Sequence, residues 1–523
     1  MDILKKHDGL VVFLLALGIC TSFIGAYPIY ILDEARNSEA AREMFVTGDI
    51  IVPYFNGQLR TDKPPLHYFF MMLGYKLFGV NAFGARFFSG LFGALTIWFT
   101  YRNVKQWQNG ALAMMTVVIL ASSLFFVQEF HLAVPDPYLI FFFTLSLFSF
   151  YNHYKTGSTG WLVPFYGGMA LGVLAKGPIA LALPGLIVSC FLWFKGDFNR
   201  NTILRLRPLL GLGLFFLIST PWFYLVHTAT DGEWTKGFFL DHNLSRFGSE
   251  KEGHGGLFIL TPLFVILGML PFSVFIIQGF QRAWKVRKVN DFMLFSFLVS
   301  AITILFFSIS STKLPNYPMP CYPFVATMIA FYLYQLHQSQ VKSKSVLWSL
   351  VFLAVVGIAL PIGGYVALGV EQQFLEVRSV SLLLLITTAA AFLALFFYRK
   401  GALVKAFSSM AGGWMAMGLC LFGVIYPILT KKSPVSMALE YIPEESTIIV
   451  FKRFDSAFPI NFKQTFPVFD TVDELNTYLE KHPKTYVITN TRNKKDLQVL
   501  EQFHLVQEQK ALFENHVTRI YTK

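Results

Sequence analysis

Charged residues are scarce in this chain. Only 14% of its 523 residues are Asp, Glu, Lys or Arg, whereas 54% are hydrophobic and the mean hydropathy is +0.52. A soluble protein of this length seldom carries so few charges. Apolar stretches of roughly 18 or more residues recur along the chain, and each is long enough to cross a bilayer. The composition therefore argues against an ordinary soluble enzyme and predicts an all-α polytopic membrane protein.

Cysteine and acidic residues are also few. The four cysteines, Cys20, Cys190, Cys321 and Cys420, show no paired spacing, so neither a disulfide framework nor a cysteine zinc site is indicated. The 31 acidic residues are outnumbered by 43 basic ones, which gives a net charge of +12. These basic residues are scattered between apolar runs and form no stripe that fits a nucleic-acid groove. We therefore expect a lipid bilayer as a partner and no nucleic acid.

Hydropathy predicts about thirteen membrane spans. They run near 9–28, 84–101, 110–127, 137–153, 161–175, 178–194, 208–226, 257–279, 291–309, 318–336, 346–368, 380–398 and 408–428. Lys5 and Lys6 precede the first span, but no convincing cleavage site follows it, so we interpret it as a retained helix and not as a signal peptide. These lysines place the N-terminus in the cytoplasm, and every second loop is then basic. The odd number of spans places the C-terminal end outside.

The chain changes character near Lys431. Residues 431–523 are polar and read as strand, helix, strand, helix and strand. Thr471 and Glu474 form a capping box at the start of one predicted helix. We therefore divide the chain into a transmembrane catalytic domain, 1–430, and a small outer α/β domain, 431–523, in which we find no catalytic motif.

The outer loops hold nearly all the unusual polar residues. The first loop, 29–83, predicts two helices that lie in the membrane interface and do not span it. The candidate site residues of the outer loops are Asp33, Arg36, Asp62, Lys63, Asp136, His242, Arg246 and Lys313. Acids and cations thus gather at one membrane surface.

A lipid-linked sugar donor would need such a set of side chains. Its phosphate calls for Arg and Lys, because charge-assisted hydrogen bonds are the strong ones. The departing phosphate gains charge in the transition state, and fixed cations stabilise it. An acceptor hydroxyl needs a carboxylate to take its proton.

Each residue also has an ordinary structural interpretation. Asp33 would then be a helix N-cap, and Asp136 would cap the next span. His242 would be an ordinary loop histidine. Lysines at span ends commonly snorkel to lipid head groups; those in question are Lys63, Lys176 and Lys313.

Taken together, the loops resemble a known family. The similar segments are Asp33-Glu34-Ala35-Arg36, Lys63-Pro64-Pro65-Leu66-His67-Tyr68, Leu174-Ala175-Lys176-Gly177-Pro178, His242-Asn243-Leu244-Ser245-Arg246-Phe247 and Lys313-Leu314-Pro315-Asn316-Tyr317. Over roughly residues 10–335 the chain resembles lipid A 4-amino-4-deoxy-L-arabinose transferases. These belong to the GT-C class of membrane glycosyltransferases, which includes protein O-mannosyltransferases. The resemblance implies a GT-C fold in a bacterial inner membrane, with the C-terminal domain in the periplasm.

The resemblance also implies an activity. It is an inverting transfer of a sugar from an undecaprenyl phosphate-linked donor to lipid A or another envelope glycan, with no organic cofactor. Asp33 and Asp136 then fall at acidic catalytic positions. The donor-phosphate positions fall to Lys63 and Arg246, with Arg36 and Lys313 as further candidates. The residue before Lys-Pro-Pro is usually Glu and can hold a divalent metal; here it is Asp62, one methylene shorter, with His242 as a co-ligand by proximity in sequence.

Three alternatives stay open. A protein O-mannosyltransferase-like enzyme would use Ser or Thr of a protein as the acceptor. A transporter or flippase would show inverted repeats and intramembrane charges, whereas the predicted spans are nearly free of charge. A structural scaffold would not need acids and bases clustered together. The sugar, the acceptor and the oligomeric state are not specified by the sequence.

Overall fold

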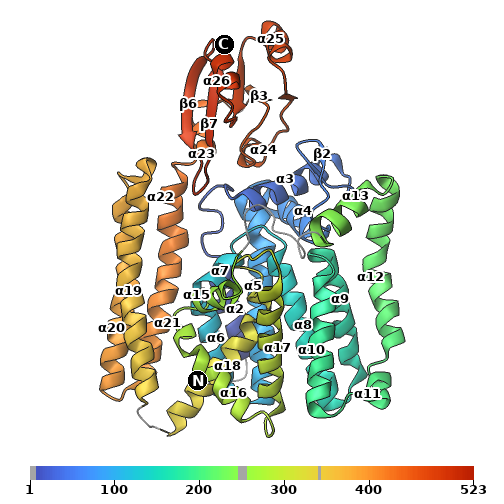
Figure 1. The fold of residues 1–523 in the computed structure, drawn as a ribbon, viewed down its shortest axis with the longest axis vertical. Helices are drawn as coiled ribbons and strands as arrows, with labels where there is room; N and C mark the ends of the chain where they lie inside the picture. The colour runs from blue at the N-terminus through green and yellow to red at the C-terminus, as the bar shows by residue number, and fades with distance from the viewer. Residues whose placement is uncertain (1–7, 245–255, 340–342, 444) are drawn as a thin grey trace.

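The computed structural model describes residues 8–244, 256–339, 343–443 and 445–523. It consists of a helical bundle, a layer of short elements over one end of the bundle, and a sheet domain beyond that layer (Figure 1). The fold is mainly helical, as predicted, and the predicted C-terminal α/β domain is present.

The bundle contains helices of very different length. In chain order they are α2 (Asp8–Cys20), α5 (Ala82–Trp107), α6 (Gly110–Ser122), α7 (Leu124–Glu129), α8 (Asp136–Thr156), η1 (Thr159–Trp161), α9 (Leu162–Ala175), α10 (Ile179–Lys195), α11 (Arg200–Arg205), α12 (Pro208–Ala229), α15 (Leu260–Gly268), η3 (Phe272–Phe275), α16 (Ile276–Lys285), α17 (Asp291–Ile309), η4 (Met319–Cys321), α18 (Tyr322–Ser339), α19 (Lys344–Val370), η5 (Gln372–Phe374), η6 (Arg378–Leu384), α20 (Leu385–Arg399), α21 (Leu403–Cys420), η7 (Leu421–Ile425) and α22 (Tyr426–Thr430). Every predicted span overlaps at least one of these helices.

Fewer helices meet a length criterion for crossing a bilayer. Among the described residues six helices are long and apolar enough, or seven if α15 and the segment after its 118° bend form one span. Four further apolar helices are shorter, among them α2 and α6. The count of thirteen spans therefore stays a prediction, whereas the polytopic membrane fold is confirmed.

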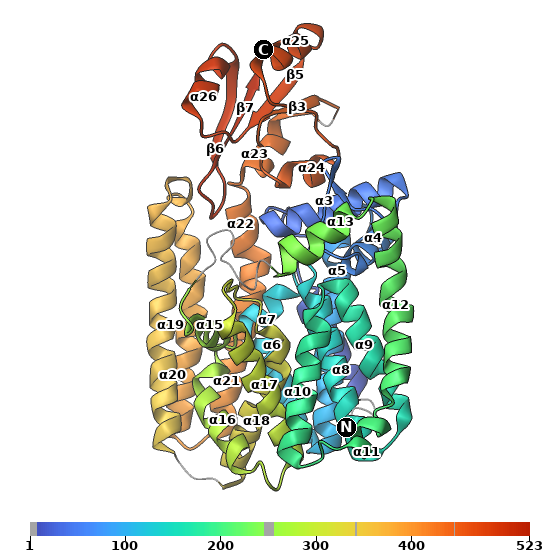
Figure 2. The same ribbon diagram turned by 45° about the vertical axis from the view of Figure 1, so that its right-hand side comes forward.

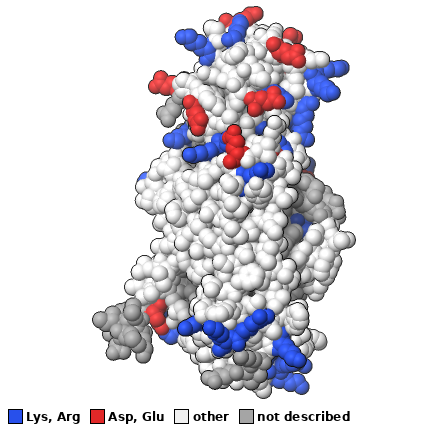
Figure 3. All heavy atoms as spheres, turned by 90° about the vertical axis from the view of Figure 1, so that its left-hand side faces the viewer, with Lys and Arg blue, Asp and Glu red and all other residues white. Residues whose placement is uncertain are grey.

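The surface separates into charged ends and an uncharged belt. On the face shown in Figure 3, almost all Lys, Arg, Asp and Glu side chains lie at the two ends of the molecule. Between them α19 exposes large apolar side chains, with Trp348 70% and Val366 60% exposed. Apolar groups exposed over such an area are stable only against lipid.

A layer of short elements covers the end of the bundle beneath the sheet domain. It comprises α3 (Leu32–Thr47), the hairpin β1 (Tyr54–Phe55) and β2 (Gln58–Leu59), α4 (Leu66–Phe78), α13 (Glu233–Lys236) and η2 (Gly237–Leu244). Figures 1 and 2 both place α3 between the bundle and the C-terminal domain. The two helices predicted for the first loop are therefore present as α3 and α4.

A fully buried ion pair fixes this layer to the bundle. Arg86 of α5 donates from Nε and Nη2 to the Glu34 carboxylate at 2.6 and 2.9 Å. Its Nη1 also donates to the carbonyls of Ile24 and Tyr27, at 2.7 and 2.9 Å. Because a buried charge is stable only when paired and hydrogen-bonded, this network determines where α3 begins.

The C-terminal domain is built on one mixed sheet. Its strands are β3 (Thr447–Phe451), β4 (Val468–Phe469), β5 (Thr485–Thr489), β6 (His504–Lys510) and β7 (Val517–Thr522), in the order β4-β3-β5-β7-β6. The pairs of β3 with β4 and β5 are parallel, and the other pairs are antiparallel. Its helices are α23 (Pro434–Tyr441), α24 (Ala457–Phe462), α25 (Val472–Lys481) and α26 (Lys494–Leu500). The predicted capping box of Thr471 and Glu474 is confirmed at the start of α25.

This domain is docked on the first loop. Asn56, at the tip of the β1–β2 hairpin, donates to the carbonyl of Phe466 and accepts from its N–H, at 3.0 and 2.7 Å. Phe55 stacks on Phe454 with ring centroids 6.1 Å apart. The sheet domain thus supports the loop that carries Asp33 and Lys63.

Candidate active site

Arg60 organises the acidic residues of the first loop. Its side chain is 7% exposed and donates to Asn37 and Tyr68, each at 3.0 Å. From this fixed position its Nη2 lies 2.9 Å from the Asp62 carboxylate and 3.9 Å from that of Asp33. One buried guanidinium therefore lies between the carboxylate of Asp33, in the first turn of α3, and that of Asp62, which precedes α4.

Asp33 is an ionised carboxylate among cations. Its side chain is half exposed, and the N-cap of α3 is Ile31, so the N-cap interpretation of Asp33 is wrong. Partial desolvation acts to raise the pKa of Asp33, but the charges of Lys63, Arg60 and Lys176 outweigh it and hold that pKa below its ordinary value. At neutral pH Asp33 therefore carries a negative charge.

A cavity of about 150 Å³ lies beside these groups. Its polar lining consists of Asp62, Lys63, Lys176, His242, Ser310 and Tyr317, and its apolar lining of Leu139, Ile179, Phe238, Phe306 and Phe307. The residues come from the first loop and from the ends of α8, α9, α10, α17 and the η2 segment. A cavity lined by both cations and apolar side chains suits a ligand with an anionic head and a hydrocarbon tail.

Lys63 and Lys176 are the cations of this cavity. Lys63 is 8% exposed, and no residue in the described parts of the chain hydrogen-bonds its amine. Lys176 forms an ion pair with Asp136, and its amine lies 5.2 Å from the centre of the Tyr317 ring. Both amines are held within the protein, which argues against the snorkelling interpretation.

Asp136 is the first residue of α8, but its side chain makes no capping hydrogen bond. The capping interpretation is therefore wrong as well, and the carboxylate instead orients Lys176 at the end of α9. Because α8 and α9 pack closely, the pair is held by the bundle and not by a loop.

Glu129 is a second carboxyl group behind this pair. It ends α7, beyond the predicted span 110–127, and is 6% exposed. Its Oε1 has no hydrogen-bond partner among the described residues. Burial, and next the Asp136 carboxylate, raise the pKa of Glu129 to about 8 against the opposing effect of Lys176. Glu129 is therefore mainly protonated at neutral pH.

The remaining predicted residues lie in different surroundings. Arg36 donates to the Ser456 hydroxyl of the C-terminal domain at 3.3 Å, so the structure does not bring it to the cavity. Lys313 is 8% exposed and donates to the carbonyl of Ser310, a lining residue, at 2.7 Å. Arg246 lies outside the described residues.

The two predicted metal ligands, Asp62 and His242, lie among positively charged side chains. Asp62 and His242 do line the same cavity, as their pairing as ligands requires. However, the described residues contain no group of three His, Cys, Asp or Glu side chains that could hold a metal ion. Asp62 is already paired with Arg60, and Lys63 and Lys176 line the same cavity. These residues do not fit a resident metal, and the metal stays a prediction.

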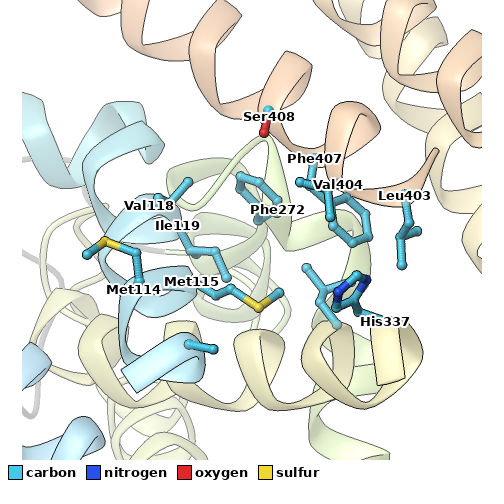
Figure 4. A pocket seen from close by; sticks show the side chains of 12 residues that line it. Met114, Met115, Val118, Ile119, Phe272, His337, Leu403, Val404, Phe407 and Ser408 are labelled. Atoms are coloured by element: carbon cyan, nitrogen blue, oxygen red, sulfur yellow. The ribbon is translucent and has the colours of Figure 1, made fainter. Parts of the chain in front are cut away.

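A second cavity is chemically different. It measures about 320 Å³ and is lined almost wholly by apolar side chains of α6, α18, α21 and η3, with only His337 and Ser408 polar (Figure 4). It holds no acidic residue, Lys or Arg, so it lacks the charged groups that line the first cavity.

Sequence reasoning missed three members of the site. They are Arg60, Glu129 and Lys176, which are far apart in the sequence. The packing of separate segments brings them to the site. Lys176 lies in one of the segments that resemble the family, so the sequence could have indicated it. Arg60 and Glu129 belong to no such motif.

Comparison with known proteins identifies the family. Residues 62–225 match the family described as dolichyl-phosphate-mannose-protein mannosyltransferase. An uncharacterised protein of Aquifex aeolicus (strain VF5) is 32% identical over 308 residues, which are 58% of this chain and 67% of that protein. The undecaprenyl phosphate-alpha-4-amino-4-deoxy-L-arabinose arabinosyl transferase of Aeromonas hydrophila is 30% identical over 58% of this chain and 56% of its own length. The chain thus spans a little over half the length of such named relatives.

A solved structure shows the same fold. It is that of ArnT from Cupriavidus metallidurans bound to undecaprenyl phosphate, with a TM-score of 0.77 and 20% sequence identity over 98% of both chains. The chain therefore belongs to the GT-C family of membrane glycosyltransferases, which includes the 4-amino-4-deoxy-L-arabinose transferases and the dolichyl-phosphate-mannose-protein mannosyltransferases.

Proposed function

We propose that this protein transfers a sugar from a polyprenyl phosphate-linked donor to an acceptor at the outer face of the bacterial inner membrane. The observation that carries the proposal is the cavity that combines the buried Lys63 and the partly buried Lys176 with apolar side chains of α8, α10 and α17. A buried ammonium group without a hydrogen-bonded partner is costly, and an anionic ligand would remove that cost.

In this proposal the donor lies with its phosphate on Lys63 and Lys176. The first isoprene units contact Leu139, Ile179 and the two phenylalanines of α17. Asp136 acts as a positioning residue, because its ion pair fixes the Lys176 amine. The lysines stabilise the charge that the phosphate gains as it departs.

The reaction would be a single displacement with inversion. The acceptor oxygen forms a bond to the anomeric carbon while the bond from that carbon to the phosphate oxygen breaks, and the proton of a hydroxyl acceptor passes through solvent to the released phosphate. Asp33 does not line the cavity, but the charges of Lys63 and Lys176 act on its carboxylate. Its lowered pKa makes it a weak base, since general bases work best with a pKa near the operating pH. The charge of Asp33 therefore favours stabilisation of positive charge on the sugar ring or orientation of the acceptor.

The relatives support a lipid-linked donor, but several acceptors fit the proposal. Lipid A is the first choice from the named transferases, with another envelope glycan or protein Ser/Thr as alternatives. We further propose that the N-terminus is cytoplasmic and that the C-terminal domain lies in the periplasm, because the end of the bundle opposite that domain is rich in Lys and Arg (Figure 3).

Reconstitution would test the activity. Purified protein in liposomes receives an undecaprenyl phosphate-linked sugar together with lipid A, a glycan or a Ser/Thr peptide, and the products are weighed by mass spectrometry. We expect one acceptor class to gain the mass of one sugar as undecaprenyl phosphate is released. Movement of intact donor across the bilayer without any product would instead favour the transporter alternative.

A further inference from the structure

A third cavity lies at the opposite end of the bundle from the candidate active site. It measures about 390 Å³ and is formed where the last turn of α8 meets the short helix α11. Figures 1 and 2 place α11 at the end of the molecule farthest from the C-terminal domain. The lining residues are Phe150, His153, Tyr154, Gly157, Thr159, Asp197, Thr202, Arg205, Leu206 and Arg207.

The charges of this cavity are not balanced. Among the described residues, no acidic side chain pairs with Arg205 or Arg207, although both line the cavity. The Asp197 carboxylate accepts a hydrogen bond from the Tyr154 hydroxyl at 2.5 Å. The neighbouring lysines behave differently, because Lys155 and Lys195 both pair with Asp291, at 2.9 and 2.8 Å. The two lysines thus share one carboxylate, whereas the two arginines are available to an anion.

Arg207 has an unusual backbone as well. Its φ of +49° lies in the left-handed region, and it immediately precedes Pro208, the first residue of α12. This region is uncommon for a residue with a long side chain. Strained residues persist where the surrounding structure holds them, and they occur often at binding sites.

The surroundings place this cavity at a membrane surface. The apolar side chains of Phe198, Leu204 and Leu209 are 53%, 57% and 83% exposed. Side chains of this kind are stable at the boundary between lipid tails and head groups. α12, which begins beside them, is mostly exposed along its apolar length and lies at one edge of the bundle (Figure 2).

We propose that this cavity binds the phosphate of an anionic phospholipid in the membrane leaflet opposite the candidate active site, with Arg205 and Arg207 as its ligands. Arginine is suited to this role because its planar guanidinium donates two hydrogen bonds to a phosphate. Thr159 and Thr202 add hydroxyl groups to the same lining. The acyl chains would extend along the exposed apolar face beside α11 and α12.

Native mass spectrometry of the full-length purified protein tests this site. The protein is titrated with phosphatidylglycerol and, separately, with the zwitterionic phosphatidylcholine. The test variants are Arg205→Gln, Arg207→Gln and their combination. The matched control is Arg200→Gln, because Arg200 begins the same helix but does not line the cavity. Combined Arg205→Lys and Arg207→Lys substitutions keep the charge.

The proposal predicts tighter binding of phosphatidylglycerol than of phosphatidylcholine. Each Arg→Gln substitution should weaken phosphatidylglycerol binding about fivefold, and the double substitution roughly 25-fold, as expected for basic residues at a membrane surface. Arg200→Gln should bind as the unsubstituted protein does, and the lysine variant should retain most of the affinity. Equal binding of the two lipids, or undiminished binding by the double variant, would overturn the proposal. Displacement of the lipid by millimolar inorganic phosphate would show that the site takes a free anion and that the lipid assignment is wrong.

Discussion

Replacing Glu129 with Gln should stabilise the protein, although Glu129 is buried beside the candidate active site. The pKa of this carboxyl is raised from 4.5 to about 8 because burial disfavours the charged form. In the unfolded chain the group ionises near pH 4.5, whereas in the folded protein it ionises only near pH 8. Between these values the unfolded state binds fewer protons, so stability falls as pH rises. Below pH 4.5 the group does not lower the free energy of unfolding, and above pH 8 it lowers that free energy by a constant amount.

The size of the effect follows from the same values. Each pH unit between the two pKa values costs about 1.4 kcal/mol, which amounts to about 3 kcal/mol at pH 7. Gln has nearly the same shape and cannot ionise, so Glu129→Gln should recover up to this amount. The difference between the variant and the unsubstituted protein should shrink toward zero as the pH approaches 4.5.

Glu34 provides the matched control. It is also a buried glutamate of the outer region, but its charged form is stabilised by an arginine. Both its oxygens accept hydrogen bonds from the fully buried Arg86. Glu34→Gln should therefore destabilise the protein by about 3–5 kcal/mol, since it leaves a buried guanidinium without its counter-ion.

Thermal unfolding followed by intrinsic tryptophan fluorescence, from pH 5 to pH 9, measures both effects. We expect the Tm of Glu129→Gln to exceed that of the unsubstituted protein at pH 7 by an amount that decreases with falling pH. A lower Tm for Glu129→Gln at pH 7, or a difference independent of pH, would refute the reasoning. The same carboxyl should raise the KM for an anionic donor above pH 8, and Glu129→Gln should remove that rise.

The remaining predictions concern the cavity and the topology. Lys63→Ala and Lys176→Ala should each cost about 2–5 kcal/mol of transition-state stabilisation, measured as kcat/KM, while the exposed Lys76→Ala should be neutral; near-normal turnover would remove a lysine from the donor site. Asp33→Asn should lower kcat by roughly 10²-fold or more with little change in Tm, and a fully active variant would contradict a role in the reaction. Full activity of protein shown to be metal-free after chelation would exclude the predicted metal at Asp62. A periplasmic reporter fused to the C-terminus should be active, and an inactive one would reverse the proposed orientation.

Membrane topology explains how much of the site could be predicted from the sequence. Residues on the same side of a bilayer are confined to one thin layer, so polar side chains from distant loops can meet there. This logic placed Lys63, Asp62 and His242 together, and all three line one cavity. The same logic, with the capping-box pattern, predicted a polar C-terminal domain.

Contacts between segments far apart in the chain could not be predicted from the sequence. Arg60 acts through Asn37 and Tyr68, and no local pattern distinguishes it from a surface arginine. Arg36 lies on a helix that we expected at the membrane surface, but the C-terminal domain covers it, and its partner Ser456 is 420 residues away. The burial of Glu129 depends likewise on how α7 packs, which hydropathy does not specify.

Binding of undecaprenyl phosphate to the purified protein tests the central claim most directly, namely that the cavity at Lys63 and Lys176 holds a lipid phosphate. Its affinity is measured for the unsubstituted protein, for Lys63→Ala and Lys176→Ala, and for Lys76→Ala as a control. We predict that each cavity substitution weakens binding at least tenfold, as the loss of a buried charge-assisted contact requires, while Lys76→Ala binds normally. Undiminished binding by folded Lys63→Ala and Lys176→Ala proteins would contradict the account.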